Sequence, residues 1–322
     1  MDLLKVRNLQ TRIYSFRGIV KAVDGVSFSL NEGETLGIVG ETGCGKSMTA
    51  LSILRLLPRR AKIVNGEILF QGENLISKSD DEMRRIRGRD IAMIFQDPNT
   101  CLNPLFKVGA QVVEALIVHK KLPKREAESE VIDAFKSVGI PDPEKRLNSY
   151  PHELSGGMKQ RIMIAMGLLH NPKLLIADEP TTALDTTIQG QILELMKDLK
   201  TKSNTATLLI THNIGIVAET CDNVAVMYAG EIVEWGDVVS VIDNPKHPYT
   251  RCLLQAFPSR KKAFCAIPGS VPDAIEPPSG CKFHPRCKFA KDKCRKTKPS
   301  LVELENQTRS VCCHINANGD CI

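Results

Sequence analysis

Gly40-Glu41-Thr42-Gly43-Cys44-Gly45-Lys46-Ser47 carries the strongest signal in this chain. The stretch matches the pattern G-x-x-x-x-G-K-[ST], follows an apolar run that starts at Thr35, and opens a helical pattern at Lys46. Glycines allow the backbone to curl so that several N–H groups and a helix N-terminus face a polyphosphate. The Lys46 ammonium then neutralises the β- and γ-phosphates, and the Ser47 hydroxyl ligates Mg²⁺. We therefore expect a nucleoside triphosphate site here.

Two further buried strands are expected to end in polar residues at the same edge of the sheet. Asp178-Glu179 closes the run from Leu174, and His212 follows the run Ala206–Thr211. Ligands bind outside the carboxyl ends of parallel strands, so these side chains should point at the nucleotide. Asp178 suits Mg²⁺ through water, and Glu179 suits activation of the attacking water as a general base. The alternative for the acidic pair is a helix N-cap, and a single histidine is often structural.

Composition places the chain among ordinary globular proteins. It has 322 residues, of which 42% are hydrophobic and 25% charged, so global disorder is excluded. Lys and Arg number 43 against 37 Asp and Glu, and a net charge of +6 is too weak to indicate nucleic acid. No apolar run approaches the roughly 20 residues of a membrane span, and no secretion signal is recognised at Met1. We expect a cytoplasmic chain.

The fold class predicted from the pattern is α/β. Short apolar runs alternate with longer helical patterns over the first 240 residues, which is typical of a parallel sheet with helices. Between about 98 and 158 only helical periodicity occurs, so a helical insert is expected. Pro and Cys become frequent after about residue 240, where we place a boundary. The predicted domains are a nucleotide-binding domain at 1–240 and a small irregular C-terminal extension at 241–322. The predicted strands are 35–40, 90–95, 173–178 and 206–211; the predicted helices are 46–57, 108–119, 125–138, 156–169 and 187–202.

A glycine-bearing helix N-terminus, Leu154 to Arg161, precedes the strand that carries Asp178. It is a second potential anion site on a chain that already has one. A single subunit has no obvious use for two such sites, but two subunits facing head to tail can each lend the second site to the other's nucleotide. The alternative is a plain serine cap followed by flexible glycines.

With these motifs, residues 1–240 resemble the ATP-binding cassette (ABC) family. The resemblance implies a P-loop core with an antiparallel β subdomain and an inserted helical subdomain. Lys46 and its loop resemble the Walker A motif, Asp178-Glu179 the Walker B motif, and His212 the switch histidine. Gln96 matches the Q-loop glutamine that touches Mg²⁺ or water, and Asp185 matches the D-loop. The signature loop that would cap the partner's nucleotide is Ser155, Gly156, Gly157 and Met158.

The same resemblance implies how ATP and Mg²⁺ are bound. Tyr14 or Phe16 is expected to stack on adenine. Glu179, His212, Lys46 and Gln96 are the expected catalytic residues, and Ser47, Gln96 and Asp178 the expected Mg²⁺ site. Cys44 stands where serine is commoner in the family, at a position where only the backbone should matter. Besides the aromatic pair, the expected nucleotide-binding residues are Gly40, Glu41, Thr42, Gly43, Cys44, Gly45, Lys46, Ser47, Met48, Gln96, Asp178 and His212.

The tail narrows the resemblance to one branch. His247-Pro248-Tyr249 and the segment Gly280–Cys287 resemble the C-terminal region of oligopeptide and dipeptide importer ATPases. This implies two integral membrane permease subunits, a second ATP-binding subunit (different or identical), and indirectly an extracytoplasmic solute-binding protein. The chain would lie peripherally on the cytoplasmic face of the cell membrane. A nickel importer ATPase of the same branch is the alternative. A non-transport ABC ATPase acting on nucleic acid or ribosomes is a more distant one.

Cys281, Cys287, Cys294 and Cys312 place four thiols within 32 residues. Thiolates select soft metals, and the C-x₂₋₄-C pairs that zinc favours are absent from these four. A [4Fe-4S] cluster tolerates longer loops between its ligands. Peptide-importer ATPases with this cysteine pattern resemble known carriers of such a cluster. Eight lysines and arginines between Lys282 and Lys298 could offset the cluster's charge. The prediction is a [4Fe-4S] cluster, with Zn²⁺ or unligated thiols as alternatives; the sequence does not decide between a structural and a regulatory role.

Overall fold

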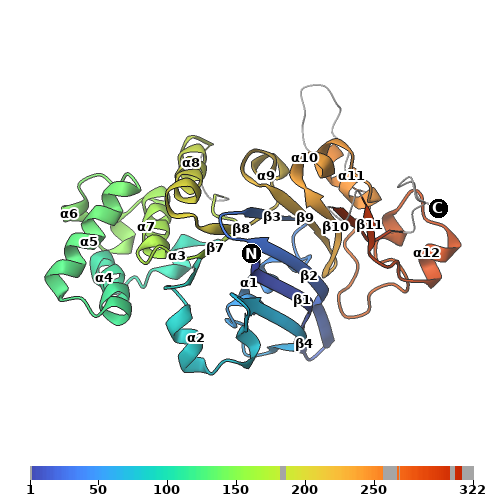
Figure 1. Cartoon of the computed structure of the whole chain (residues 1–322), viewed down its shortest axis with the longest axis horizontal. Helices are drawn as coiled ribbons and strands as arrows, with labels where there is room; N and C mark the ends of the chain where they lie inside the picture. The colour runs from blue at the N-terminus through green and yellow to red at the C-terminus, as the bar shows by residue number, and fades with distance from the viewer. Residues whose placement is uncertain (1, 182–185, 257–266, 268, 305–308, 314–322) are drawn as a thin grey trace. The chain divides into compact units, whose positions relative to one another are not determined.

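The computed structural model describes residues 2–181, 186–256, 267, 269–304 and 309–313 (Figure 1). The chain forms two compact units. The first comprises residues 1–30, 35–77 and 209–322, and the second comprises 31–34 and 78–208. Residues 241–322 thus belong to the same compact unit as the N-terminal strands.

The first unit contains an antiparallel sheet at its N-terminal end. Its order is β2-β1-β4-β5, and Figure 1 shows β1, β2 and β4 side by side. Strand β1 pairs with β4 from Leu4 opposite Phe70 to Ile13 opposite Ala61. Side chains such as Leu4, Val6 and Ile68 are buried because they share the face that packs on the core. The bounds are β1 Asp2–Ser15, β2 Gly18–Asn31, β4 Ala61–Phe70 and β5 Glu73–Asn74.

Within the first unit a second set of strands follows the order β11-β12-β10-β9-β3. Strands β3 and β9 are parallel, with Leu36 opposite Asn223 and Val39 opposite Val226. Every residue of β3 is buried, as expected for a parallel strand covered on both faces. The bounds are β3 Thr35–Val39, β9 Asn223–Tyr228, β10 Glu231–Asp237, β11 Val302–Leu304, β12 Arg309–Val311, α1 Lys46–Ile53, η1 Leu75–Ser77, α9 Ile214–Thr220, α10 Val238–Asp243, α11 Pro248–Gln255, η3 His284–Arg286 and α12 Asp292–Lys296.

The second unit combines two parallel strands with a group of helices. Strand β6 pairs with β7 from Ile91 opposite Leu174 to Ile94 opposite Ala177. Helices α4, α5, α6 and α7 lie together in Figure 1. Helix α5 buries Ala127, Val131 and Phe135, spaced four residues apart on one face. The bounds are β6 Ile91–Ile94, β7 Leu174–Asp178, α2 Asp80–Ile86, α3 Pro98–Cys101, α4 Val108–Lys120, α5 Lys124–Ser137, α6 Pro143–Arg146, η2 Pro151–Glu153, α7 Gly156–Leu168 and α8 Thr186–Ser203; β8, Ala206–Thr211, crosses into the first unit.

The predicted elements are confirmed with small changes at their ends. All described elements from Pro98 to Leu168 are helical, as expected. Helix α1 stops at Ile53 rather than at 57, because Arg55 adopts φ 51° and Pro58 follows closely. No helix in the described part of the chain is long and apolar enough to cross a membrane.

Basic residues of the cysteine-rich segment bind carboxylates of the first unit. Lys282, only 8% exposed, lies 2.7 Å from Asp24 and 3.0 Å from Glu231. Lys298 also contacts Glu231, at 2.7 Å. The expectation that these cations offset the charge of a thiolate cluster is therefore wrong for Lys282 and Lys298. These ion pairs attach the C-terminal segment to β2, which carries Asp24, and to β10, which carries Glu231.

The pKa of Asp24 gives a test of the Lys282–Asp24 ion pair. Burial alone would raise that pKa, but the hydrogen bonds and charges of Lys282 and Arg12 outweigh it and lower it to about 2. A carboxyl whose folded-state pKa is lowered stabilises the protein above its unfolded-state pKa, near 4, and the contribution disappears as the pH falls toward 2.

We expect Asp24→Asn to lower the free energy of unfolding by about 2 kcal/mol at pH 7. The loss should shrink progressively between pH 4 and 2, where the wild-type carboxylate becomes protonated. Urea unfolding of both proteins at pH 7 and 3.5 measures the difference. Asp81→Asn is the control, because that side chain is 79% exposed. A loss that is equal at both pH values would contradict the role of the Asp24 charge.

Candidate functional site

The loop after β3 is shaped by glycines that no other residue can replace without movement. Gly45, the N-cap of α1, has φ 108°, and a Cβ there would lie 2.3 Å from the carbonyl oxygen of Ala22. A Cβ on Gly40 would lie 2.1 Å from the carbonyl oxygen of Met227. The backbone therefore curls tightly between β3 and the first turn of α1. Such a curl before a helix N-terminus is the backbone conformation that the predicted anion site requires.

Lys46 is buried and lies across this loop. Its Nζ donates hydrogen bonds to the carbonyl oxygens of Gly40 at 2.7 Å and Glu41 at 3.1 Å. Nζ also approaches Cys44 Sγ at 3.7 Å. Cys44 is fully buried, so its side chain fills space under the loop while its backbone shapes the site. An ammonium held in this position can bind phosphate oxygens over the loop.

Gln96 and Glu179 meet at the carboxyl ends of adjacent strands. Because β6 and β7 are parallel and in register, the residues after Ile94 and Asp178 share one edge. Gln96 Nε2 donates to Glu179 Oε2 at 2.9 Å. Glu179 adopts φ 47°, a conformation that side-chain-bearing residues rarely take. The structure thus brings together the predicted Q-loop glutamine and the predicted general base.

Asp178 ends β7 and is buried. The turn after it is tied to α7, because Gln160 Nε2 donates to the Pro180 carbonyl oxygen at 2.7 Å. Gln160 is itself buried, so this bond fixes the distance between α7 and the turn that carries Glu179. A movement of α7 would therefore be felt at the predicted base.

Ser155 is the N-cap of α7. Its hydroxyl accepts a hydrogen bond from the Met158 N–H at 3.3 Å, so the serine is a helix cap, as the alternative held. The helix start formed by Ser155, Gly156 and Gly157 is at least partly exposed. A Cβ on Gly156 would meet nothing within 4 Å. The cap leaves this helix N-terminus open to a ligand or a partner.

The remaining predicted residues lie as follows. His212, exposed, directly follows β8. Tyr14, near the end of β1, is 42% exposed, and Phe16, in the turn after it, is 91% exposed, so both rings are accessible to a base. Asp185 lies outside the described residues.

Sequence reasoning missed two residues of the tail that contact the loop. Tyr249 Oη accepts a hydrogen bond from the Glu41 N–H at 2.9 Å. Arg286 donates to both carboxylate oxygens of Glu41, at 2.7 and 3.0 Å. In the sequence, His247-Pro248-Tyr249 indicates only a family branch, and Gly280–Cys287 indicates that branch and two cluster ligands. Nothing in their spacing indicates a contact with residue 41.

The four predicted cluster ligands are not gathered into a ligand set. Among the residues that the structure describes, no group of three or more His, Cys, Asp or Glu could hold a metal ion. Burial, and then the neighbouring Cys294, raise the pKa of Cys281, and burial followed by Glu231 raises that of Cys312 to about 12. Cys312 Sγ donates to the Pro299 carbonyl oxygen at 3.3 Å. Burial thus favours the neutral thiol over the thiolate at both positions.

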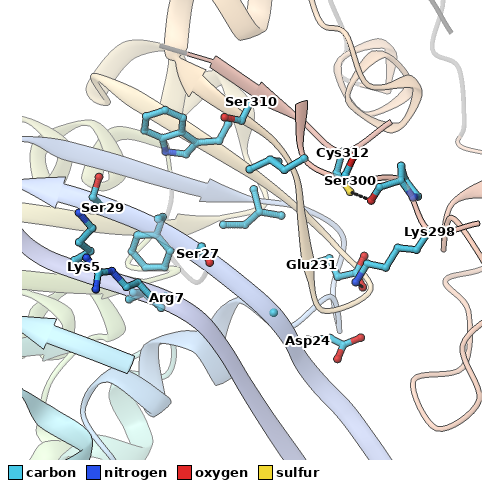
Figure 2. Close-up of a pocket in the computed structure, with 17 residues that line it drawn as sticks. Lys5, Arg7, Asp24, Ser27, Ser29, Glu231, Lys298, Ser300, Ser310 and Cys312 are labelled. Carbon is cyan, nitrogen blue, oxygen red and sulfur yellow. Dashed lines mark hydrogen bonds and ion pairs between the residues drawn. The ribbon is translucent and has the colours of Figure 1, made fainter. Parts of the chain in front are cut away.

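A cavity of about 690 Å³ lies elsewhere in the first unit. It is lined by residues of β1, β2 and β10, Phe28 and Trp235 among them, and by Lys298–Leu301, Ser310 and Cys312; Figure 2 labels Asp24, Glu231, Lys298 and Cys312 around it. No residue of the predicted ATP site lines it. Asp24 and Glu231 line this cavity, so it lies beside the ion pairs that these carboxylates form with Lys282.

Comparison with known proteins places these features in a family. The ABC transporter model matches residues 23–182, and the model of the oligopeptide/dipeptide transporter C-terminal region matches 233–294. A probable peptide ABC transporter ATP-binding protein of Sinorhizobium fredii is 51% identical over 98% of this chain and 95% of its own length. The oligopeptide transport protein OppD of Bacillus subtilis is 52% identical over 89% and 82%. The dipeptide transport protein DppD of Escherichia coli is 46% identical over 97% and 96%.

Solved structures agree. A dimeric ATP-binding cassette in a post-hydrolysis state with ADP and Pi has 27% identity and a TM-score of 0.67, covering 73% of this chain and 98% of its own. The cbiO1 subunit of the Clostridium perfringens cbiONQ transporter has 32% identity and a TM-score of 0.63, covering 76% and 91%. The chain therefore belongs to the ATP-binding proteins of the ABC transporters, in the oligopeptide and dipeptide branch.

Proposed function

We propose that this chain is the ATP-hydrolysing subunit of an ABC importer of dipeptides or oligopeptides. The observation that carries the proposal is the likeness to peptide-transport ATP-binding proteins over nearly the whole chain, tail included. Its partners are two membrane permease subunits, a second ATP-binding subunit and, indirectly, a solute-binding protein. It works peripherally on the cytoplasmic face of the membrane.

The chemistry follows from the residues already placed. Lys46 and the loop N–H groups bind the β- and γ-phosphates of ATP, and Tyr14 or Phe16 stacks on adenine. Ser47, Gln96 and Asp178 offer the oxygen ligands that Mg²⁺ prefers, and the ion would neutralise charge on the phosphates. Glu179 orients and polarises water for attack on the γ-phosphate, with His212 beside the phosphate. The Gln96–Glu179 hydrogen bond holds the base in place.

Two cassettes close head to tail over two ATP molecules. Each ATP lies between the Lys46 loop of one subunit and the Ser155–Met158 segment of the other, whose open helix N-terminus faces the phosphates. Closure moves the helical insert at 98–158 and, through it, the permeases.

The alternatives have less support. The relatives named above are peptide-transport proteins rather than nickel or ribosome-associated ones. A nucleic-acid surface on the tail is disfavoured because Lys282 and Arg286 are buried in ion pairs and Phe283 is buried. These side chains are not available to phosphates or bases.

We expect Glu179→Gln to slow ATP hydrolysis at least about a hundredfold, because the amide cannot act as a base. ATP binding should persist, and the protein should accumulate as a closed dimer. Phosphate release and size-exclusion chromatography with ATP and Mg²⁺ measure these effects. Glu126→Gln, an exposed carboxylate in the first turn of α5, is the matched control. Undiminished hydrolysis in Glu179→Gln would remove that residue from the role of base.

Gly157→Arg tests the shared site. A long cation at the start of α7 should block the approach of a partner's nucleotide, so hydrolysis should fall about a hundredfold while ATP binding to the Lys46 loop is kept. Gly190→Arg is the control, because a Cβ on that exposed helical glycine meets nothing within 4 Å. ATPase activity is measured across a range of protein concentrations. Concentration-independent activity, or full activity of Gly157→Arg, would exclude the head-to-tail dimer.

The [4Fe-4S] cluster stays a prediction, supported by the spacing of the four cysteines and not by the described geometry. Protein purified without oxygen should be brown, absorb near 400 nm and contain iron and labile sulfide. Cys281→Ser should remove the colour, and Cys101→Ser, outside the segment, should not. Colourless protein that carries zinc, or no metal, would overturn the prediction.

A further inference from the structure

The C-terminal region reaches the phosphate-binding loop at a single residue, Glu41. The Glu41 N–H donates to Tyr249 Oη, and the Glu41 carboxylate accepts from both terminal nitrogens of Arg286. These partners lie 208 and 245 residues further along the chain. Glu41 is thus held through both its backbone and its side chain by the tail.

The Arg286–Glu41 pair is shielded from water. The Arg286 side chain is 4% exposed and that of Glu41 is 27% exposed. Two parallel N–H···O bonds fix the relative orientation of the two groups as well as their distance. A surface ion pair contributes little, but a buried bidentate pair is costly to break because it leaves an unpaired charge.

Three aromatic rings support this contact. The centroids of Tyr228 and Tyr249 are 4.6 Å apart, and Phe283 lies 5.2 and 5.4 Å from them. The Arg286 guanidinium lies over the Tyr228 ring at 5.8 Å. Tyr228 ends β9, which is parallel to β3, so it lies beside the start of the loop. The rings therefore form a packed base under Glu41.

The start of α11 is anchored independently. The fully buried Glu234 carboxylate accepts hydrogen bonds from the Lys246 and His247 N–H groups, both at 2.9 Å. Burial lowers the pKa of His247 to about 3, so its ring is neutral and Nδ1 accepts from the Tyr249 N–H at 3.0 Å. The position of the Tyr249 hydroxyl is therefore set by β10 and by the helix cap.

Glu41 is also a partner of the phosphate-binding lysine. Lys46 Nζ bonds the carbonyl oxygens of Glu41 and of Gly40 just before it. The residue that the tail holds thus also binds Lys46 through its backbone carbonyl oxygen. A shift of Glu41 would displace the ammonium and the first turn of the loop together.

We propose that Tyr249 and Arg286 are positioning residues of the ATP site, which act through Glu41 so that the C-terminal region sets the affinity for ATP. The inference rests on the proposed ATP site at Lys46. Both residues contact Glu41 in the loop proposed to bind ATP. We therefore expect their loss to weaken nucleotide binding and not to slow the chemical step. The tail is then a part of the motor and not only a mark of its branch.

Two variants, one mild and one more severe, test the positioning role of Tyr249 and Arg286. Tyr249→Phe removes one oxygen and keeps the ring packing, and Arg286→Met removes the charge but keeps most of the length. We expect the Kd of a nonhydrolysable ATP analogue and the KM for ATP to rise a few-fold in the first and about tenfold in the second. kcat at saturating ATP should stay within about twofold of wild type. Arg295→Met, an exposed arginine of α12, should change neither constant.

A double-mutant cycle separates positioning from general destabilisation. Glu41→Gln should raise KM about as much as Arg286→Met, and the double variant should be no worse than either single one. Arg286→Lys should restore part of the affinity. A purely structural role would lower the melting temperature of every variant but leave the KM of the folded protein unchanged, and additive effects would likewise overturn the proposal.

Lys46→Ala separates a failure of the proposed ATP site from a failure of the positioning role. If Lys46→Ala binds the analogue as tightly as wild type, the proposed ATP site is wrong. If Lys46→Ala loses binding while Tyr249→Phe and Arg286→Met keep wild-type Kd and KM, the ATP site stands and the positioning role fails.

Discussion

The structure depends on a backbone that passes through a space too narrow for side chains. At Gly40 and Gly45 a Cβ would lie within 2.3 Å of a carbonyl oxygen. The chain can therefore leave a buried strand, turn tightly and enter α1. The position of Lys46, the proposed phosphate ligand, and the contact of Glu41 with the tail follow from this turn.

Parallel strand ends organise the chemistry within each unit. In the second unit the register of β6 and β7 brings Gln96 to Glu179. In the first unit the register of β3 and β9 places Tyr228 beside the loop that contains Glu41. The same geometric rule thus brings together the predicted Q-loop glutamine and general base in one unit and a packed aromatic base in the other.

The tail packs on the rest of the first unit through buried ion pairs. The sequence alone suggests that these charges are exposed. Lys282 and Arg286 come from a segment rich in basic residues, which suggests a solvated or ligand-facing cluster. Both are buried and paired, with Asp24 and Glu231 and with Glu41. The positive charges thus attach the tail to the nucleotide-binding fold.

Local motifs alone determined much of this protein. The Gly40–Ser47 pattern, the Asp178-Glu179 pair and the Ser155 segment each rest on short-range rules of glycine freedom, buried strands and helix caps. The strand and helix ranges follow from periodicity for the same reason. Only the tertiary structure decided that Tyr249 and Arg286 meet Glu41, and that Gln96 lies on Glu179. Such contacts join residues 83 to 245 positions apart, and no local pattern encodes which strand ends and which loops become neighbours.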